Sequence, residues 1–266
     1  MRLRSLSLVL CSLACLGQPV FGHESWVEPL KYQVESGDTV AIHMRNGEMF
    51  AGSDLAFFDH QLTRAELAGT DTTFPYEGRM GDIPAFTVQA ASQGLMTLIV
   101  ETEPAEVKYK TWEEFEKFLI EKDLSQIPAM HAGRGLPKQD FWETYSRHSK
   151  TLISVGHGEG SDTVRGMDIE LVALSNPNGL ENGAGMPVQL NAQSAPVPGT
   201  QIEVFEKAPD KTVTRFKVRT GQDGRSIVPV QPKHQYLLNA VIIRPADAGE
   251  RAVWRTLWAS LTFALP

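Results

Sequence analysis

The sequence predicts a mainly β protein, with an N-terminal β-rich domain that carries a two-helix insertion and a C-terminal β-sandwich. Short runs of alternating apolar and polar residues, separated by Gly, Pro, Asn or Asp, recur along most of the chain. One segment, at about 111–151, departs from this period and has helical spacing. A composition of 42% hydrophobic and 21% charged residues is typical of a globular protein and excludes disorder and collagen-like structure.

The first 22 residues are typical of a secretory signal peptide. Arg2 and Arg4 precede an apolar stretch at 6–16 that is too short to span a bilayer. Gly22 supplies a small residue before the cleavage point, so we expect a periplasmic mature chain that begins at His23. No later stretch is long and apolar enough to predict a membrane span.

Both cysteines, Cys11 and Cys15, lie inside this signal segment. A lipoprotein anchored at Cys15 is the alternative, but Ser12 stands where a bacterial lipobox usually has Leu. The net charge of −7 and the lack of a Lys/Arg-rich run predict a protein that does not bind nucleic acid.

The N-terminal domain is expected at 23–155 and begins with strands. The clearest alternation is at 39–44, and turns are expected at 35–38 and at Asn46-Gly47. The strands predicted here are 26–27, 32–34, 39–44, 55–58, 85–88 and 95–100.

Two helices are predicted in the insertion. Thr111 followed by Glu114 forms a capping box, so the first helix is expected from Trp112 to about Asp123. The Pro- and Gly-containing segment 128–137 predicts a loop. The second helix is expected at 138–151, because its apolar and aromatic residues recur near one helical face: Phe141, Tyr145, His148 and Leu152.

The glycine-rich segment 156–160 predicts a flexible connection to the C-terminal domain at 164–266. Regularly spaced short strands predict a β-sandwich there, and we expect it to fold alone. Its strands are expected at 168–174, 186–192, 200–206, 212–219, 225–230, 235–243 and 254–264.

Several motifs resemble one family in order and spacing over nearly the whole mature chain. They are the start His23-Glu24-Ser25-Trp26-Val27-Glu28-Pro29, the Tyr-x-Arg-x-x-Lys segment 145–150, the segment 166–172, and the segments 220–225, 236–238 and 258–263. The family they resemble is DUF4198, a bacterial periplasmic family of undefined activity. Ser25 stands where the family has an aromatic residue, and Met167 stands where its members often have His.

This resemblance implies a β-rich periplasmic protein with a transthyretin- or immunoglobulin-like C-terminal sandwich. It also implies metal handling, because the family is associated with periplasmic components of nickel and cobalt uptake. A membrane transporter component or an outer-membrane receptor would then be the partner. The Met at position 167 weakens the transfer of a metal site to that segment.

His23 at the new N-terminus would offer a metal two nitrogens, those of its amine and its imidazole. Such a pair suits a divalent transition metal, Ni, Co or Cu, and tetragonal nitrogen sites favour Cu(II) and Ni(II). His43 is the expected third ligand, and Glu24 or Glu28 could supply an oxygen. The alternative is that cleavage merely leaves His23 first, in solvent.

Three functions therefore stay open. The first is a non-enzymatic carrier or accessory of metal uptake, and the second is a copper-dependent oxidative enzyme that uses the N-terminal His. The third is a metal-free adhesion or scaffold module. No catalytic residue is predicted, because the chain has no Gly-x-Ser-x-Gly motif and no cysteine after the signal segment.

Overall fold

The computed structural model describes residues 23–69, 72–181 and 183–266. The predicted signal peptide and Cys15 lie outside the described residues. The predicted fold class is confirmed, since the chain is mainly β with two α-helices among the described residues. Neither of these helices is long and apolar enough to cross a bilayer.

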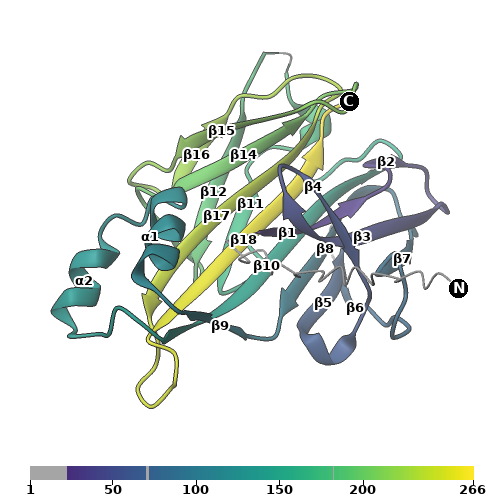
Figure 1. Ribbon diagram of the computed structural model, residues 1–266. Coiled ribbons are helices and arrows are strands. Elements are labelled where there is room, and N and C mark those ends of the chain that lie inside the picture. Colours follow the sequence, from purple (N-terminus) through teal and green to yellow (C-terminus); the bar gives the residue numbers. More distant parts are fainter. Residues whose placement is uncertain (1–22, 70–71, 182) are drawn as a thin grey trace, which may run out of the picture.

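A ten-stranded sheet, here called the central sheet, runs through the whole molecule. Its order is β15-β14-β17-β18-β10-β8-β5-β6, and β2 and β9 also pair with β10. Figure 1 shows β10 and β18 side by side in the middle, where nine consecutive pairs join them in parallel. The strands are β2 (Gln33–Val34), β5 (Leu62–Ala68), β6 (Thr73–Pro75), β8 (Gly94–Thr102), β9 (Ala105–Tyr109), β10 (Phe141–Val155), β14 (Gln201–Lys207), β15 (Val213–Arg219), β17 (Gln235–Pro245) and β18 (Trp254–Ala264).

Two smaller sheets cover opposite faces of the central sheet. Leu152 of β10 belongs to the core beneath one of them and the next residue, Ile153, to the core beneath the other, as alternation along a strand requires. The N-terminal sheet contains β1 (Glu24–Pro29), β3 (Thr39–Glu48), β4 (Ala51–Leu55) and β7 (Phe86–Gln89). The C-terminal sheet contains β11 (Ile169–Ala173), β12 (Met186–Ala192), β13 (Ala195–Pro196) and β16 (Arg225–Val228).

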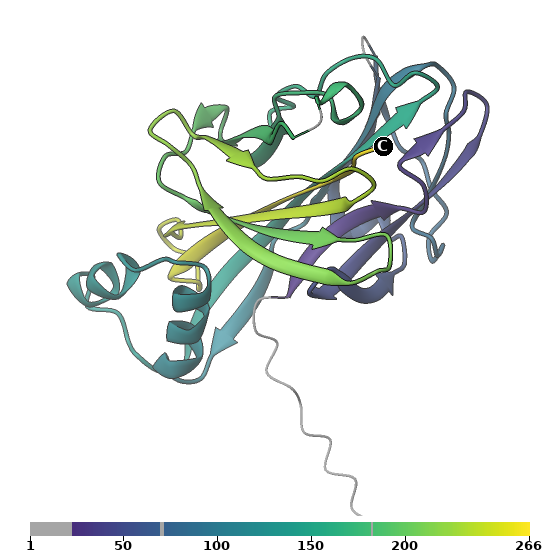
Figure 2. The same ribbon diagram turned by 90° about the horizontal axis from the view of Figure 1, so that it is seen from above.

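The two helices, α1 (Trp112–Glu121) and α2 (Ile127–Gly133), stand at one end of the molecule, away from β3 and β7 (Figure 2). The Thr111 cap is confirmed, since the Glu114 backbone N–H donates to Thr111 Oγ1. The reciprocal bond of the capping box is shifted by one residue, because Glu114 Oε2 accepts from the Lys110 N–H. Phe115 and Phe118 of α1 pack with Trp258 of β18 in an aromatic core.

The second helix was predicted at the wrong place. Residues 138–151 were expected to be helical, but Phe141–Val155 is the strand β10, and the helix α2 lies in the segment predicted as a loop. Residues 148–155 are buried on both faces of the central sheet, so alternation does not reveal the strand. Pro128 stands in the first turn of α2, where its missing N–H costs nothing.

The C-terminal strands agree closely with their prediction, and 186–192 and 254–264 agree at both ends. In the N-terminal half the strands β5, β6 and β9 were not predicted, and the strand expected at 55–58 shares only Leu55 with β4. Asn46-Gly47 lies inside β3, and the turn falls three residues later, at Met49-Phe50.

The segment 156–160 was predicted to be a flexible connection, but hydrogen bonds hold it in place. The Leu95 N–H donates to the Glu159 carbonyl, and the Asn176 side chain donates to the carbonyls of Gly158 and Gly160. Strands from both sides of this segment enter the central sheet, so the predicted domains at 23–155 and 164–266 share that sheet.

Candidate metal site at the edge of the N-terminal sheet

His23 lies directly before β1, at the exposed edge where β1 meets the end of β3. The register that pairs Glu24 with Gly47 brings His23 next to Glu48. His23 Nε2 is 3.2 Å from Glu48 Oε1, and the two side chains are 36% and 69% exposed. An imidazole and a carboxylate therefore converge at a place that solvent and a metal ion can reach.

His43 does not join this pair. It sits opposite Glu28 in the β1–β3 register and lies five positions from Glu48, about 17 Å along a strand. Its Nδ1 is 3.0 Å from Asp54 Oδ2 on β4. β3, the strand that was expected to bring His43 back to the N-terminus, does pair with β1. His43, however, lies at the opposite end of the paired segment from His23.

Glu24 is committed to an interior ion pair. Its side chain is buried, and Lys122 Nζ donates to Glu24 Oε1 over 3.0 Å and to Glu203 Oε2 over 2.6 Å. Burial raises the pKa of Glu24, and the positive charge of Lys122 opposes that shift. A metal that took this carboxylate would leave the buried Lys122 with one partner fewer.

Glu28 is equally occupied. Its carboxylate accepts from Trp26 Nε1 at 3.0 Å and from Arg45 and Lys207, each at 2.7 Å. Both expected oxygen donors therefore support the fold where β1 crosses the central sheet.

Among the described residues, no group of three His, Cys, Asp or Glu side chains lies close enough to hold a metal. His23 and Glu48 supply two donors, so a metal bound there would need a third ligand. Sequence reasoning missed Glu48 because Asn46-Gly47 was taken as the turn, which would have ended the strand before it.

Comparisons with known proteins assign the chain to a family. A family described as Domain of unknown function (DUF4198) matches residues 20–244. The chain belongs to the DUF4198 family. No curated protein matches this DUF4198 chain.

Two solved structures have a weak likeness to this DUF4198 protein. The D0-D1 domain of Intimin is 8% identical with a TM-score of 0.21, over 90% of this chain and 97% of that one. The Yersinia pseudotuberculosis adhesin InvE is 12% identical with a TM-score of 0.20, over 91% of this chain and 58% of that one. Superpositions this poor carry no argument about function.

Proposed function

We propose that this DUF4198 protein is a non-enzymatic periplasmic metal-binding protein, a carrier or accessory in the uptake of nickel, cobalt or copper. Its partner would be a membrane transporter component or an outer-membrane receptor. The observation that carries the proposal is the contact of 3.2 Å between His23 Nε2 and Glu48 Oε1 at an exposed edge. The chain's start at His23 after signal cleavage would place the third donor, the amine, on the same residue.

The proposed ligands are the His23 amine, the His23 imidazole and the Glu48 carboxylate. Two nitrogens and one oxygen, with open positions left for water or a partner's ligand, suit Cu(II) or Ni(II). Such an open, exposed site fits a protein that passes its metal on, because a receiving protein can reach the ion. Glu48 replaces His43 and Glu24 in the expected ligand set.

Calorimetric titration of Ni(II) into protein that begins at His23 tests this proposal. We expect one ion per chain, with most of the affinity lost in His23→Ala and in protein with one extra Gly before His23. Glu48→Gln should weaken binding by a smaller factor, and His157→Ala, a change of another exposed His, should leave it unchanged. Binding should also weaken below about pH 6, because the amine and the imidazole must lose protons to bind the metal.

Equal affinity in the extended and unextended proteins would contradict the proposal, since the amine would then not be a ligand. No binding in either protein would favour the metal-free module. Reductant-dependent peroxide turnover by the copper-loaded protein would favour the oxidative enzyme.

A further inference from the structure

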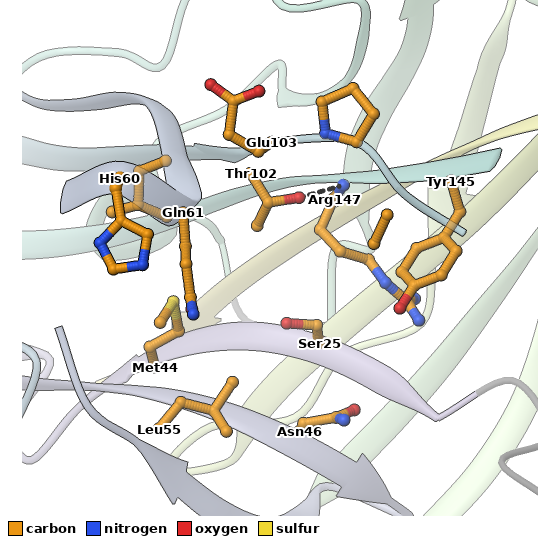
Figure 3. Close-up of a pocket in the computed structure, with 13 residues that line it drawn as sticks. Ser25, Met44, Asn46, Leu55, His60, Gln61, Thr102, Glu103, Tyr145 and Arg147 are labelled. Atoms are coloured by element: carbon orange, nitrogen blue, oxygen red, sulfur yellow. Dashed lines mark hydrogen bonds between the residues drawn. The ribbon is translucent and has the colours of Figure 1, made fainter. Parts of the chain in front are cut away.

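A cavity of about 440 Å³ lies between the N-terminal sheet and the central sheet, at a place where the central sheet splits. β10 pairs with β9 over 141–145 and with β8 over 152–155, and residues 146–151 pair with neither strand. Arg147 lies in this gap, and its backbone N–H donates to Thr102 Oγ1 at 3.0 Å (Figure 3).

The Arg147 guanidinium is held by aromatic rings and by no acidic group. It lies 3.9 Å from the ring centre of Trp258 and 5.2 Å from that of Tyr145. Within the described part of the chain, its side chain makes no ion pair or hydrogen bond, and the buried atom Nη1 has no partner. Burial lowers the pKa of Arg147 to about 10, so the group still carries its charge at neutral pH.

The two carboxylates whose negative charges act on Arg147 are hydrogen-bonded to other residues. Glu24 binds Lys122, and Glu143 accepts from Tyr109 and Thr256. Glu103 lines the cavity, but Figure 3 shows its carboxylate turned away from the guanidinium. No carboxylate among the described residues forms an ion pair with the Arg147 guanidinium, so the cavity wall holds a positive charge without a close counter-charge.

The opposite wall presents a second unused polar atom. Asn46 Oδ1 on β3 is buried and accepts no hydrogen bond from any described residue. Figure 3 places Asn46 and Ser25 on the strands that face Arg147 across the cavity. The lining also includes the apolar side chains of Met44, Leu55 and Leu62 and the polar side chains of His60 and Gln61.

We propose that this cavity binds a small organic carboxylate that carries a neighbouring hydroxyl or amino group and an apolar body. The carboxylate would take the free N–H groups of Arg147, whose planar fork matches two carboxylate oxygens. The neighbouring donor would satisfy Asn46 Oδ1, and the apolar body would contact Met44, Leu55 and Leu62. This site is separate from the proposed metal site, since it uses neither His23 nor Glu48.

The proposal is tested by calorimetry with 3-phenyllactate, with 3-phenylpropionate, which lacks the hydroxyl, and with inorganic phosphate. We expect 3-phenyllactate to bind about tenfold more tightly than 3-phenylpropionate, because only the former satisfies Asn46. Arg147→Met should lose at least tenfold in affinity for both acids. Arg147→Lys, which keeps the charge but not the fork, should weaken both by a smaller factor.

Asn46→Leu should remove the discrimination between the two acids, which a merely structural role of Asn46 would not do. Arg79→Met is the matched control, because Arg79 is an exposed arginine that pairs with Asp82 away from the cavity. Unchanged binding in Arg147→Met and Arg147→Lys would overturn the proposal. Binding of phosphate in preference to both acids would overturn the carboxylate assignment, and failure of both acids to bind would overturn the site.

Discussion

His148 is a buried imidazole that the fold keeps neutral. It is 4% exposed on β10, where its Nδ1 lies 3.3 Å from the Trp258 carbonyl and its Nε2 lies 3.6 Å from Glu101 Oε2. Burial lowers its pKa to about 4, against the opposing effects of the hydrogen bond with the Trp258 carbonyl and of the charge of Asp168. Arg64 already binds the Glu101 carboxylate, which therefore does little to stabilise a charged imidazole.

This shift predicts a pH dependence of stability. Between pH 4 and 6.5 the unfolded chain binds a proton at His148 that the folded protein does not, so stability falls as the pH falls. Relative to His148→Gln, the wild-type protein should lose about 3 kcal/mol of unfolding free energy between pH 7 and pH 4. Urea denaturation of both proteins across this range measures the difference.

Comparing the two proteins is necessary because Glu143 titrates in the opposite sense. Burial raises its pKa to about 7, so its contribution is present at low pH and is lost as the pH rises from about 4.5 to 7. This contribution is common to wild type and His148→Gln and cancels in the difference. A pH-independent difference between them would mean that folding leaves the pKa of His148 unchanged.

The residues that the sequence singled out show how far prediction reaches. The terminal position of His23 stays a prediction from the signal segment, and its partner Glu48 could not be predicted, because that pairing depends on the β1–β3 register. Arg147 was noted only as part of the Tyr-x-Arg-x-x-Lys segment, with no role assigned to it. Its free guanidinium matters only because β1, β3 and β10, far apart in the sequence, enclose one cavity.

At the scale of elements, prediction succeeded where a strand is half-buried and bounded by turn residues. β12 is half-buried, with alternating burial over Met186–Leu190, and was placed at both ends. β18 was also placed at both ends, although it is buried over nearly its whole length. β10 is not half-buried, because both of its faces are covered from His148 onward. Helical and strand spacing fit its apolar residues equally well, and its place in the central sheet decides between them.

The β3–β4 hairpin has a two-residue turn formed by unsuitable residues. Met49 and Phe50 have φ of 52° and 55°, values that favour Asn or Gly. Phe50 is nevertheless fixed there, because its ring is buried against Trp26, Phe205 and Leu237. Tertiary packing therefore sets this turn, which is why the local sequence did not reveal it.

We expect Met49→Asn to stabilise the protein by about 0.5–1 kcal/mol. Met49 is 40% exposed, so little packing is lost, and Asn is favoured in the left-handed conformation that this turn requires. Phe50→Gly relieves the same backbone constraint but should destabilise by about 3 kcal/mol, since it removes a buried ring. Thermal and urea unfolding measure both changes. Destabilisation by Met49→Asn would mean that the Met49 side chain supports the hairpin.

At the scale of the molecule, the two expected domains are joined through the interior. Lys150 of β10 lies in the N-terminal part and is buried, and its Nζ binds Asp162 and Glu170 at 2.8–2.9 Å. Leu95 and Leu152 belong to the same core as the C-terminal sheet. Removing the N-terminal part would thus leave the buried carboxylates of Asp162 and Glu170 without Lys150. It would also expose one side of the core beneath the C-terminal sheet to solvent.

The structure leads us to expect that residues 161–266 do not unfold cooperatively on their own, contrary to the expectation from the sequence. Without β10, the edge of β18 loses nine paired positions. The face that carries Trp254 and Trp258 loses α1, whose Phe118 stacks on Trp258 at 5.8 Å. Both tryptophans, buried in the whole protein, should then emit at the longer wavelength of solvent-exposed indole.

The mature chain should unfold in one transition, with coincident tryptophan fluorescence and far-UV circular dichroism. A sharp transition in the fragment, or two separated transitions in the whole chain, would show that the C-terminal sandwich is stable without the strand it shares.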